Sequence, residues 1–217
     1  MEIINFDKEN SLVNQYMLEL RDVNVQNDRM RFRRNIERIG EIMAYEISKR
    51  LDYENVDVMT PLATANCRKL QNDLVIGTIL RAGLPFHQGF LNYFDNAENS
   101  FVSAYRKYKE KDSFEIHIEY IASPRLDGKT LILVDPMLAT GASMELSYEA
   151  LKTKGHPKEI HLASVIASQQ AVDFIKNKFP EDKTTLWVGC IDDIINEHKY
   201  IVPGLGDAGD LAFGEKE

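Results

Sequence analysis

The chain has 217 residues, of which 44% are apolar and 28% charged, as in globular proteins with a substantial core. Its net charge of −8 and pI near 5.2 argue against binding of nucleic acid, because affinity for a phosphate backbone comes from clustered Lys and Arg. The sequence contains no apolar run of about 18 residues and does not begin with a basic and then apolar stretch, so we expect neither a membrane span nor a signal peptide.

The order of helical and strand patterns predicts the fold. Apolar residues recur every three or four positions from Asp28 to Leu51, which predicts an amphipathic helix capped by Asp28. Short β-branched runs then alternate with helical patterns, as expected of a Rossmann-like, doubly wound α/β fold with a parallel sheet in a single domain spanning residues 1–217. The predicted strands are 74–80, 130–134, 160–167 and 185–191, and the predicted helices between them are 143–154 and 170–178.

The segment from about residue 101 to residue 126 interrupts this order. Phe114, Ile116 and Ile118 alternate with polar residues, and residues 106–112 are mostly charged. We therefore expect an antiparallel excursion with an exposed, flexible tip, which we call the hood.

Ligands of such sheets bind at the carboxyl ends of the strands, which places candidate chemistry after Leu80, Val134 and Ile191. After Val134, a carboxylate at Asp135 precedes a run of small residues that opens a helix. A helix N-terminus presents unpaired N–H groups and attracts anions, whereas the upstream carboxylate suits sugar hydroxyls. This segment therefore predicts a site for a sugar phosphate.

The other two loops offer groups that suit a phosphate and a base. Arg81, followed by Ala82 and Gly83, offers a fork of donors for a phosphate. The glycine-rich loop from Asn196 to Asp210 could present backbone N–H and C=O groups to a pyrimidine, although such loops are commonly surface turns.

Isolated cysteines and histidines do not indicate a metal centre. Cys67 and Cys190 have no Cys or His nearby in the sequence, and the five histidines lack the spacing of metal ligands. Two separate thiols are typical of a protein in a reducing compartment, so we expect a cytoplasmic protein.

The string Val-Asp-Pro-Met-Leu-Ala-Thr-Gly-Ala-Ser at residues 134–143 closely resembles the motif with which the uracil phosphoribosyltransferase family binds 5-phosphoribosyl 1-diphosphate (PRPP). Other type I phosphoribosyltransferases carry a second acid where this chain has Pro136. Ile-Leu-Arg-Ala-Gly-Leu at 79–84 and Tyr-Ile-Val-Pro-Gly-Leu-Gly-Asp-Ala-Gly-Asp at 200–210 also resemble segments of this family.

The resemblance implies an enzyme that transfers the phosphoribosyl group of PRPP to uracil, giving UMP and diphosphate in pyrimidine salvage. It implies that Arg81, Arg106, Asp135 and Asp207 take part in catalysis, with a cis peptide near Arg81 and Arg106 closing over the phosphates from the hood. It implies Mg²⁺ held through PRPP and water without direct protein ligands, and a homodimer or higher homo-oligomer. The implied uracil contacts are Ile201, Gly206, Asp207 and Ala208, and the implied PRPP contacts are Arg81, Arg106, Asp135, Pro136, Met137, Leu138, Ala139, Thr140, Gly141, Ala142, Ser143 and Asp207.

Several departures from the family leave alternatives open. Ala142 stands where the family commonly has Gly and would be strained if φ were positive there. Residues 85–88 and 168–170 also differ, and Lys199 replaces a usual Gly. A related transferase for another base, or a non-catalytic regulator that responds to pyrimidine nucleotides, remain the alternatives.

Overall fold

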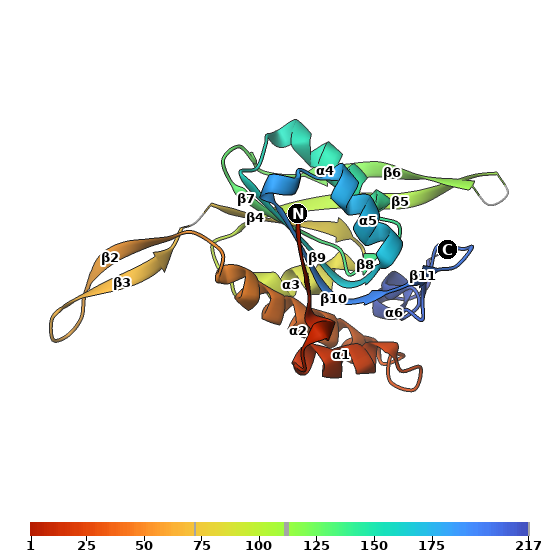
Figure 1. The fold of residues 1–217 in the computed structure, drawn as a ribbon, viewed down its shortest axis with the longest axis horizontal. Coiled ribbons are helices and arrows are strands. Elements are labelled where there is room, and N and C mark those ends of the chain that lie inside the picture. Colours follow the sequence, from red (N-terminus) through yellow and green to blue (C-terminus); the bar gives the residue numbers. More distant parts are fainter. Residues whose placement is uncertain (72, 111–112, 217) are drawn as a thin grey trace.

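The computed structural model describes residues 1–71, 73–110 and 113–216, and for residues 104–110 and 113–118 it describes the backbone alone. An eight-stranded sheet forms its centre, in the order β1-β10-β9-β7-β4-β5-β6, with β8 beside β9 (Figure 1). All neighbours are parallel except β5 and β6, so the predicted α/β class is confirmed. The strands are β1 (Glu2–Asn5), β4 (Leu74–Leu80), β5 (Glu98–Glu110), β6 (Ser113–Ala122), β7 (Thr130–Val134), β8 (Met137–Leu138), β9 (Glu159–Ser168) and β10 (Thr184–Asp192).

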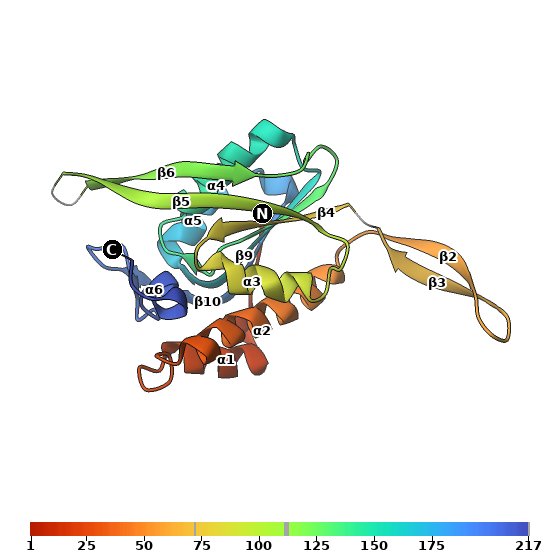
Figure 2. The ribbon, with the colours of Figure 1, turned by 180° about the vertical axis from the view of Figure 1, so that it is seen from behind.

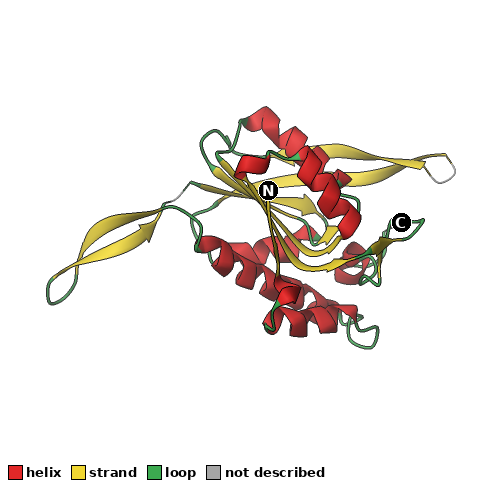
Figure 3. Ribbon diagram, in the orientation of Figure 1, coloured by secondary structure: helices red, strands yellow, loops and turns green. Residues whose placement is uncertain are grey.

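Helices cover both faces of this sheet (Figure 3). On one face lie α1 (Leu12–Arg21), α2 (Arg29–Ser48) and α3 (Gly83–Leu91), and on the other lie α4 (Ala142–Leu151) and α5 (Gln169–Lys178). Alternate strand residues serve the two layers, since Ile76 and Ile132 pack with α1–α3 whereas Val75 and Leu131 pack with α4 and α5. Short 3-10 helices lie at Phe6–Lys8, Lys152–Lys154 and Glu181–Lys183, and α6 (Ala208–Phe213) lies near the C-terminus.

The amphipathic helix predicted from residue 28 is α2. The Asp28 side chain accepts hydrogen bonds from the N–H groups of Met30 and Arg31, as expected of an N-cap. The predicted apolar stripe, from Phe32 to Ile47, is buried against the sheet and α3. None of the helices in the described part of the chain is long and apolar enough to cross a bilayer.

Two hairpins extend from the body in opposite directions (Figure 2). One is the predicted antiparallel excursion, formed by β5 and β6, although it begins at Glu98 because the first half of β5 is a sheet strand paired with β4. The other, which we call the arm, consists of β2 (Tyr53–Met59) and β3 (Thr64–Leu70) and was not predicted. Nearly all residues of the arm are exposed, so its strands lack the apolar alternation that a half-buried hairpin shows.

Candidate functional site

The carboxyl ends of β4 and β7 place two predicted site residues along one edge. Thr78 of β4 is in register with Val134 of β7, so Arg81 and Asp135 both lie just beyond these neighbouring strands. The turn after Arg81 is pressed against them, because a Cβ atom on Gly83 would lie 2.2 Å from Thr78 Oγ1. The peptide bond between Leu80 and Arg81 is cis, as the resemblance implied.

The segment from Ala139 to Ser143 forms the expected turn into a helix. Gly141 has φ 82° and is the N-cap of α4, so the N-cap has no side chain to accept from the first-turn N–H groups. Ala142 N–H donates a long hydrogen bond to Thr140 Oγ1 (3.4 Å). A Cβ atom at Gly141 would lie 2.6 Å from the Phe174 ring, so this position requires glycine both for conformation and for space. The N–H groups of Ser143 and Met144, which follow in the same first turn, are the ones that an anion could bind.

Two departures from the family leave this turn intact. Ala142 is the first helical residue of α4 and has no positive φ, so its methyl group causes no backbone strain. Ser168 donates a hydrogen bond from Oγ to the Ala139 carbonyl (2.6 Å) and accepts one from Ala171 N–H (2.9 Å). The side chain of Ser168 thus caps α5 and also holds the turn from Ala139 to Ser143.

Asp135 lies in a closely packed setting while keeping some accessible surface. Its carboxyl group accepts a hydrogen bond from Met137 N–H (3.2 Å). Desolvation raises the pKa of Asp135 to about 7, and the Met137 bond lowers it only in part. An under-satisfied carboxyl group at this position suits hydroxyl donors of a bound sugar.

The segment predicted to bind the base is held by a small hairpin of β11 (Ile194–Ile195) and β12 (Ile201–Val202). Ile201 and Ala208 are buried, so little of either residue is open to a base in this structure. Gly206 between them is exposed and has φ 91°. Of these three positions Gly206 is the one open to a base, and the contacts expected at Ile201 and Ala208 stay predictions.

Asp210 connects this segment to Arg81, and Asp207 pairs with Lys216. Arg81 Nη2 lies 2.8 Å from Asp210 Oδ1, and Lys216 Nζ lies 3.2 Å from Asp207 Oδ2. Desolvation alone would raise the pKa of Asp207, but hydrogen bonds from Asp210 N–H, Lys216 and Gly209 N–H outweigh it and lower the pKa. Asp207 is also the N-cap of α6. Asp210 was not predicted as a site residue, although its place at the end of the Asp-Ala-Gly-Asp string at 207–210 could have indicated it.

A hollow of about 240 Å³ lies beside the base segment. Gly206, Asp207 and Asp210 line it from one side, and Gln26 and Arg29 contribute from the loop before α2 and its first turn. The hollow therefore adjoins three of the residues in the Gly-rich motif.

Arg106 is placed by its backbone only. Ser103 of β5 pairs with Leu80, so Arg106 lies three residues further along β5, beyond the end of β4, in the hood. Its side chain falls outside the described part of the structure, and its predicted phosphate contact stays a prediction.

The remaining expectations from the sequence concern the histidines and a metal bound directly by the protein. His87 is buried in α3 with Nε2 2.7 Å from Asn99 Oδ1, which is a packing role. Among the residues whose side chains are described, no three His, Cys, Asp or Glu side chains gather around a point that a metal could occupy.

Comparisons with known proteins agree with this geometry. The sequence model of the family described as uracil phosphoribosyltransferase matches residues 8–215. A uracil phosphoribosyltransferase of Porphyromonas gingivalis is 64% identical over 216 residues, covering 100% of both chains. One from Pyrococcus furiosus is 41% identical over 202 residues, covering 92% of this chain and 84% of the relative.

Solved structures support the same fold. A protein of Aquifex aeolicus superimposes with a TM-score of 0.87 at 29% identity, covering 98% of both chains. A hypoxanthine phosphoribosyltransferase of Staphylococcus aureus has a TM-score of 0.50 at 15% identity, covering 86% of this chain and 83% of that one, and so shares the fold alone. Because this family model matches nearly the whole chain and a relative of that name is 64% identical over its full length, the chain belongs to the uracil phosphoribosyltransferase family.

Proposed function

We propose that the protein transfers the 5-phosphoribosyl group of PRPP to uracil, forming UMP and diphosphate. The observation that carries this proposal is the convergence of three parts: the turn at Gly141, Asp135 at the end of β7, and Arg81, which is bonded to the base segment through Asp210. These parts match the phosphate, the ribose and the diphosphate with the adjacent base.

Each part has a role in this reaction. The turn from Ala139 to Ser143 holds the 5-phosphate, and Asp135 accepts hydrogen bonds from the ribose hydroxyls. The base segment orients uracil so that N1 faces C1 of the ribose, which is catalysis by orientation. As the bond from C1 to diphosphate breaks, Arg81 and Arg106 stabilise the charge that develops on the leaving oxygens.

Arg81 must change partners to do this. In the free protein it pairs with Asp210 and donates to the Gly214 carbonyl (3.3 Å). Its side chain is 42% exposed, so the pair is held weakly and can open to a diphosphate. The pairing keeps the guanidinium near the base segment until PRPP arrives.

Mg²⁺ fits this arrangement as a partner of the substrate. The site offers separated carboxylates, Asp135 and Asp207, and an ion that keeps several waters needs few protein ligands. When bound with PRPP, Mg²⁺ would neutralise part of the diphosphate charge. Asp207, whose pKa is lowered, is the side chain that could hold a water of that ion.

The test is an assay with PRPP, Mg²⁺ and one base at a time: uracil, hypoxanthine, adenine or orotate. Formation of UMP with uracil alone is the expected result. A nucleotide formed from another base would identify a related transferase. Absence of any nucleotide, together with binding of UMP, would favour the regulator and refute the enzyme.

Homo-oligomer formation through the arm is part of the proposal. Met59 and Leu62, near the tip of the arm, are 83% and 97% exposed, and Val58 is also exposed. Apolar side chains on a projecting hairpin are stable in water when another surface covers them. Light scattering of the wild type and of Met59→Ser with Leu62→Ser should show a smaller mass for the variant, and equal masses would refute this role.

A cytoplasmic location completes the proposal. Cys67 is exposed and Cys190 is buried, and neither is in a disulfide. An exposed free thiol is stable in a reducing compartment. Fractionation of cells that express the tagged protein would test this, and recovery in an extracytoplasmic fraction would contradict it.

A further inference from the structure

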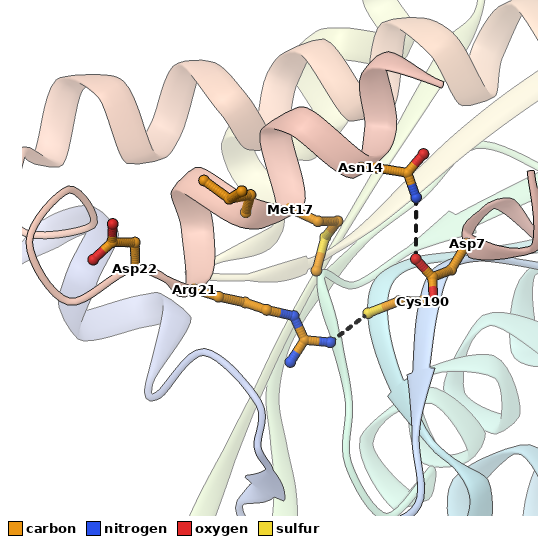
Figure 4. Close-up of a pocket in the computed structure, with 7 residues that line it drawn as sticks. Asp7, Asn14, Met17, Arg21, Asp22 and Cys190 are labelled. Atoms are coloured by element: carbon orange, nitrogen blue, oxygen red, sulfur yellow. Dashed lines mark hydrogen bonds between the residues drawn. The ribbon is translucent and has the colours of Figure 1, made fainter. Parts of the chain in front are cut away.

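Behind the base segment lies a cluster of side chains that the proposed reaction does not use. Arg21, the last residue of α1, points toward β10 and lines a hollow of about 460 Å³ beside Cys190 (Figure 4). Its guanidinium forms a bidentate pair with Asp192, with Nη2 2.7 Å from Oδ1 and Nη1 2.9 Å from Oδ2. Nη2 also lies 2.9 Å from Cys190 Sγ.

The pair grips the backbone of the base segment. Asp192 Oδ2 accepts a hydrogen bond from Gly204 N–H (2.8 Å), and Arg21 Nη1 donates to the Gly204 carbonyl (3.0 Å). Gly204 has φ 61°, and a Cβ atom there would lie 2.1 Å from the Ile201 carbonyl oxygen. Both backbone polar groups of a glycine in the left-handed conformation are therefore satisfied by two side chains from other elements.

A second contact extends this grip by one residue. Gln26 Nε2 donates to the Leu205 carbonyl (3.1 Å) and to the Leu20 carbonyl (2.8 Å). The next three residues along the chain are Gly206, Asp207 and Ala208, whose backbone is assigned to the base. The side chains that hold residues 204 and 205 thus set where this backbone lies.

Burial makes the ion pair between Arg21 and Asp192 sensitive to the loss of either charge. Asp192 is 8% exposed and Arg21 is 27% exposed. Desolvation would raise the pKa of Asp192, but hydrogen bonds from Arg21 and Gly204 N–H outweigh it and lower the pKa. The carboxylate is therefore ionised, and removal of Arg21 would leave it buried without its cation.

We propose that Arg21 is a positioning residue, which with Asp192 and Gln26 fixes the backbone of the base segment so that uracil binds in a reactive orientation. Its kinetic consequence rests on the proposed function, but its structural consequence does not. Arg21 lies outside the segments assigned to PRPP and to uracil, and its described partners are Asp192, Cys190 and Gly204. Its effect should therefore fall on the base and not on PRPP.

The test compares Arg21→Met, Arg21→Lys and Gln26→Leu with Arg31→Met as a matched control. Arg31 carries an exposed pair with Glu19 in the neighbouring helix, so its loss should change nothing measured. We expect Arg21→Met to raise KM for uracil by about tenfold or more, because small misplacements of a bound group cost up to about a hundredfold, with KM for PRPP within about twofold. Arg21→Lys should recover part of this loss, since it keeps the charge but not the fork of donors.

Hydrogen exchange provides a readout that does not depend on activity. In Arg21→Met the amides of residues 201–210 should exchange about tenfold faster, while those of β7 and β9 keep their protection. If Arg21→Met does not fold, Gln26→Leu provides the test. It should also raise KM for uracil and speed the exchange of residues 201–210, by smaller factors. Unchanged exchange in 201–210, or an equal rise of both KM values, would overturn the proposal. If the wild type forms no UMP, the proposed function fails while the exchange result still decides the role of Arg21.

Discussion

Replacing Asp135 by Asn removes a negative charge from the site while nearly keeping its shape. The folded protein holds a proton on Asp135 up to about pH 7, whereas an unfolded chain releases it near 3.8. Between these values unfolding releases a proton, so the contribution of this group to stability falls as pH rises and is lowest above pH 7. The Asp135→Asn variant has no carboxyl group at this position, so its stability lacks this decrease with pH.

The size of the effect follows from the same two values. They correspond to about 4 kcal/mol at about 1.36 kcal/mol per pKa unit, which we reduce to about 2 kcal/mol because solvent reaches part of the carboxyl group. We therefore expect Asp135→Asn to be more stable than the wild type by about 2 kcal/mol near pH 8 and equally stable near pH 4. Its kcat/KM for PRPP should fall at least about tenfold, because hydrogen bonds to a charged group contribute about 1.5–3 kcal/mol.

Urea unfolding across this pH range measures the difference. Comparison of the two proteins is needed because His161, whose pKa is lowered to about 4 by burial, destabilises both as pH falls through the same window. Asp95→Asn is the control, since Asp95 is exposed in a loop and its loss should give a flat, near-zero difference. A flat difference for Asp135→Asn, or near wild-type turnover, would refute the reasoning.

Three further predictions concern the same loops. In the wild type, kcat/KM for PRPP should fall about tenfold per pH unit below about pH 7 as Asp135 is protonated, and a flat profile down to about pH 5 would contradict this. Gly141→Ala should destabilise the protein by at least about 1–2 kcal/mol, because the left-handed conformation is costly for Ala and its Cβ would lie 2.6 Å from the Phe174 ring, and it should impair PRPP use. Ala142→Gly should leave activity within about twofold, and equal effects of the two substitutions in activity assays would be inconsistent with the geometry. Lys199→Gly should raise the free energy of unfolding by about 0.5–1 kcal/mol in urea titrations, since Lys199 has φ 64°, and a loss of stability would show that its side chain contributes there.

The parts of the fold that could be predicted are those with strong local patterns. β4 and β7 begin and end at the predicted residues because they are continuous apolar runs, buried on both faces. The arm could not be predicted, because neither face of β2 or β3 is buried and no alternation results. β1 was missed for another reason: four residues paired with β10 are too few to form a pattern.

The residues of the candidate site also differ in whether a local sequence pattern indicates them. The contacts proposed for PRPP and uracil are made largely by consecutive backbone groups, so short motifs in the sequence can indicate them. The side chains that hold those motifs obey no such spacing: Arg21 and Asp192 are 171 residues apart, and neither stands in a motif that marks it. Their role follows only from the register of β10 and the end of α1, which bring a buried carboxylate and an arginine to one glycine of the base segment. A loss of uracil binding caused by a substitution in α1 would therefore be a consequence of tertiary packing, and a motif search confined to the substrate loops would not anticipate it.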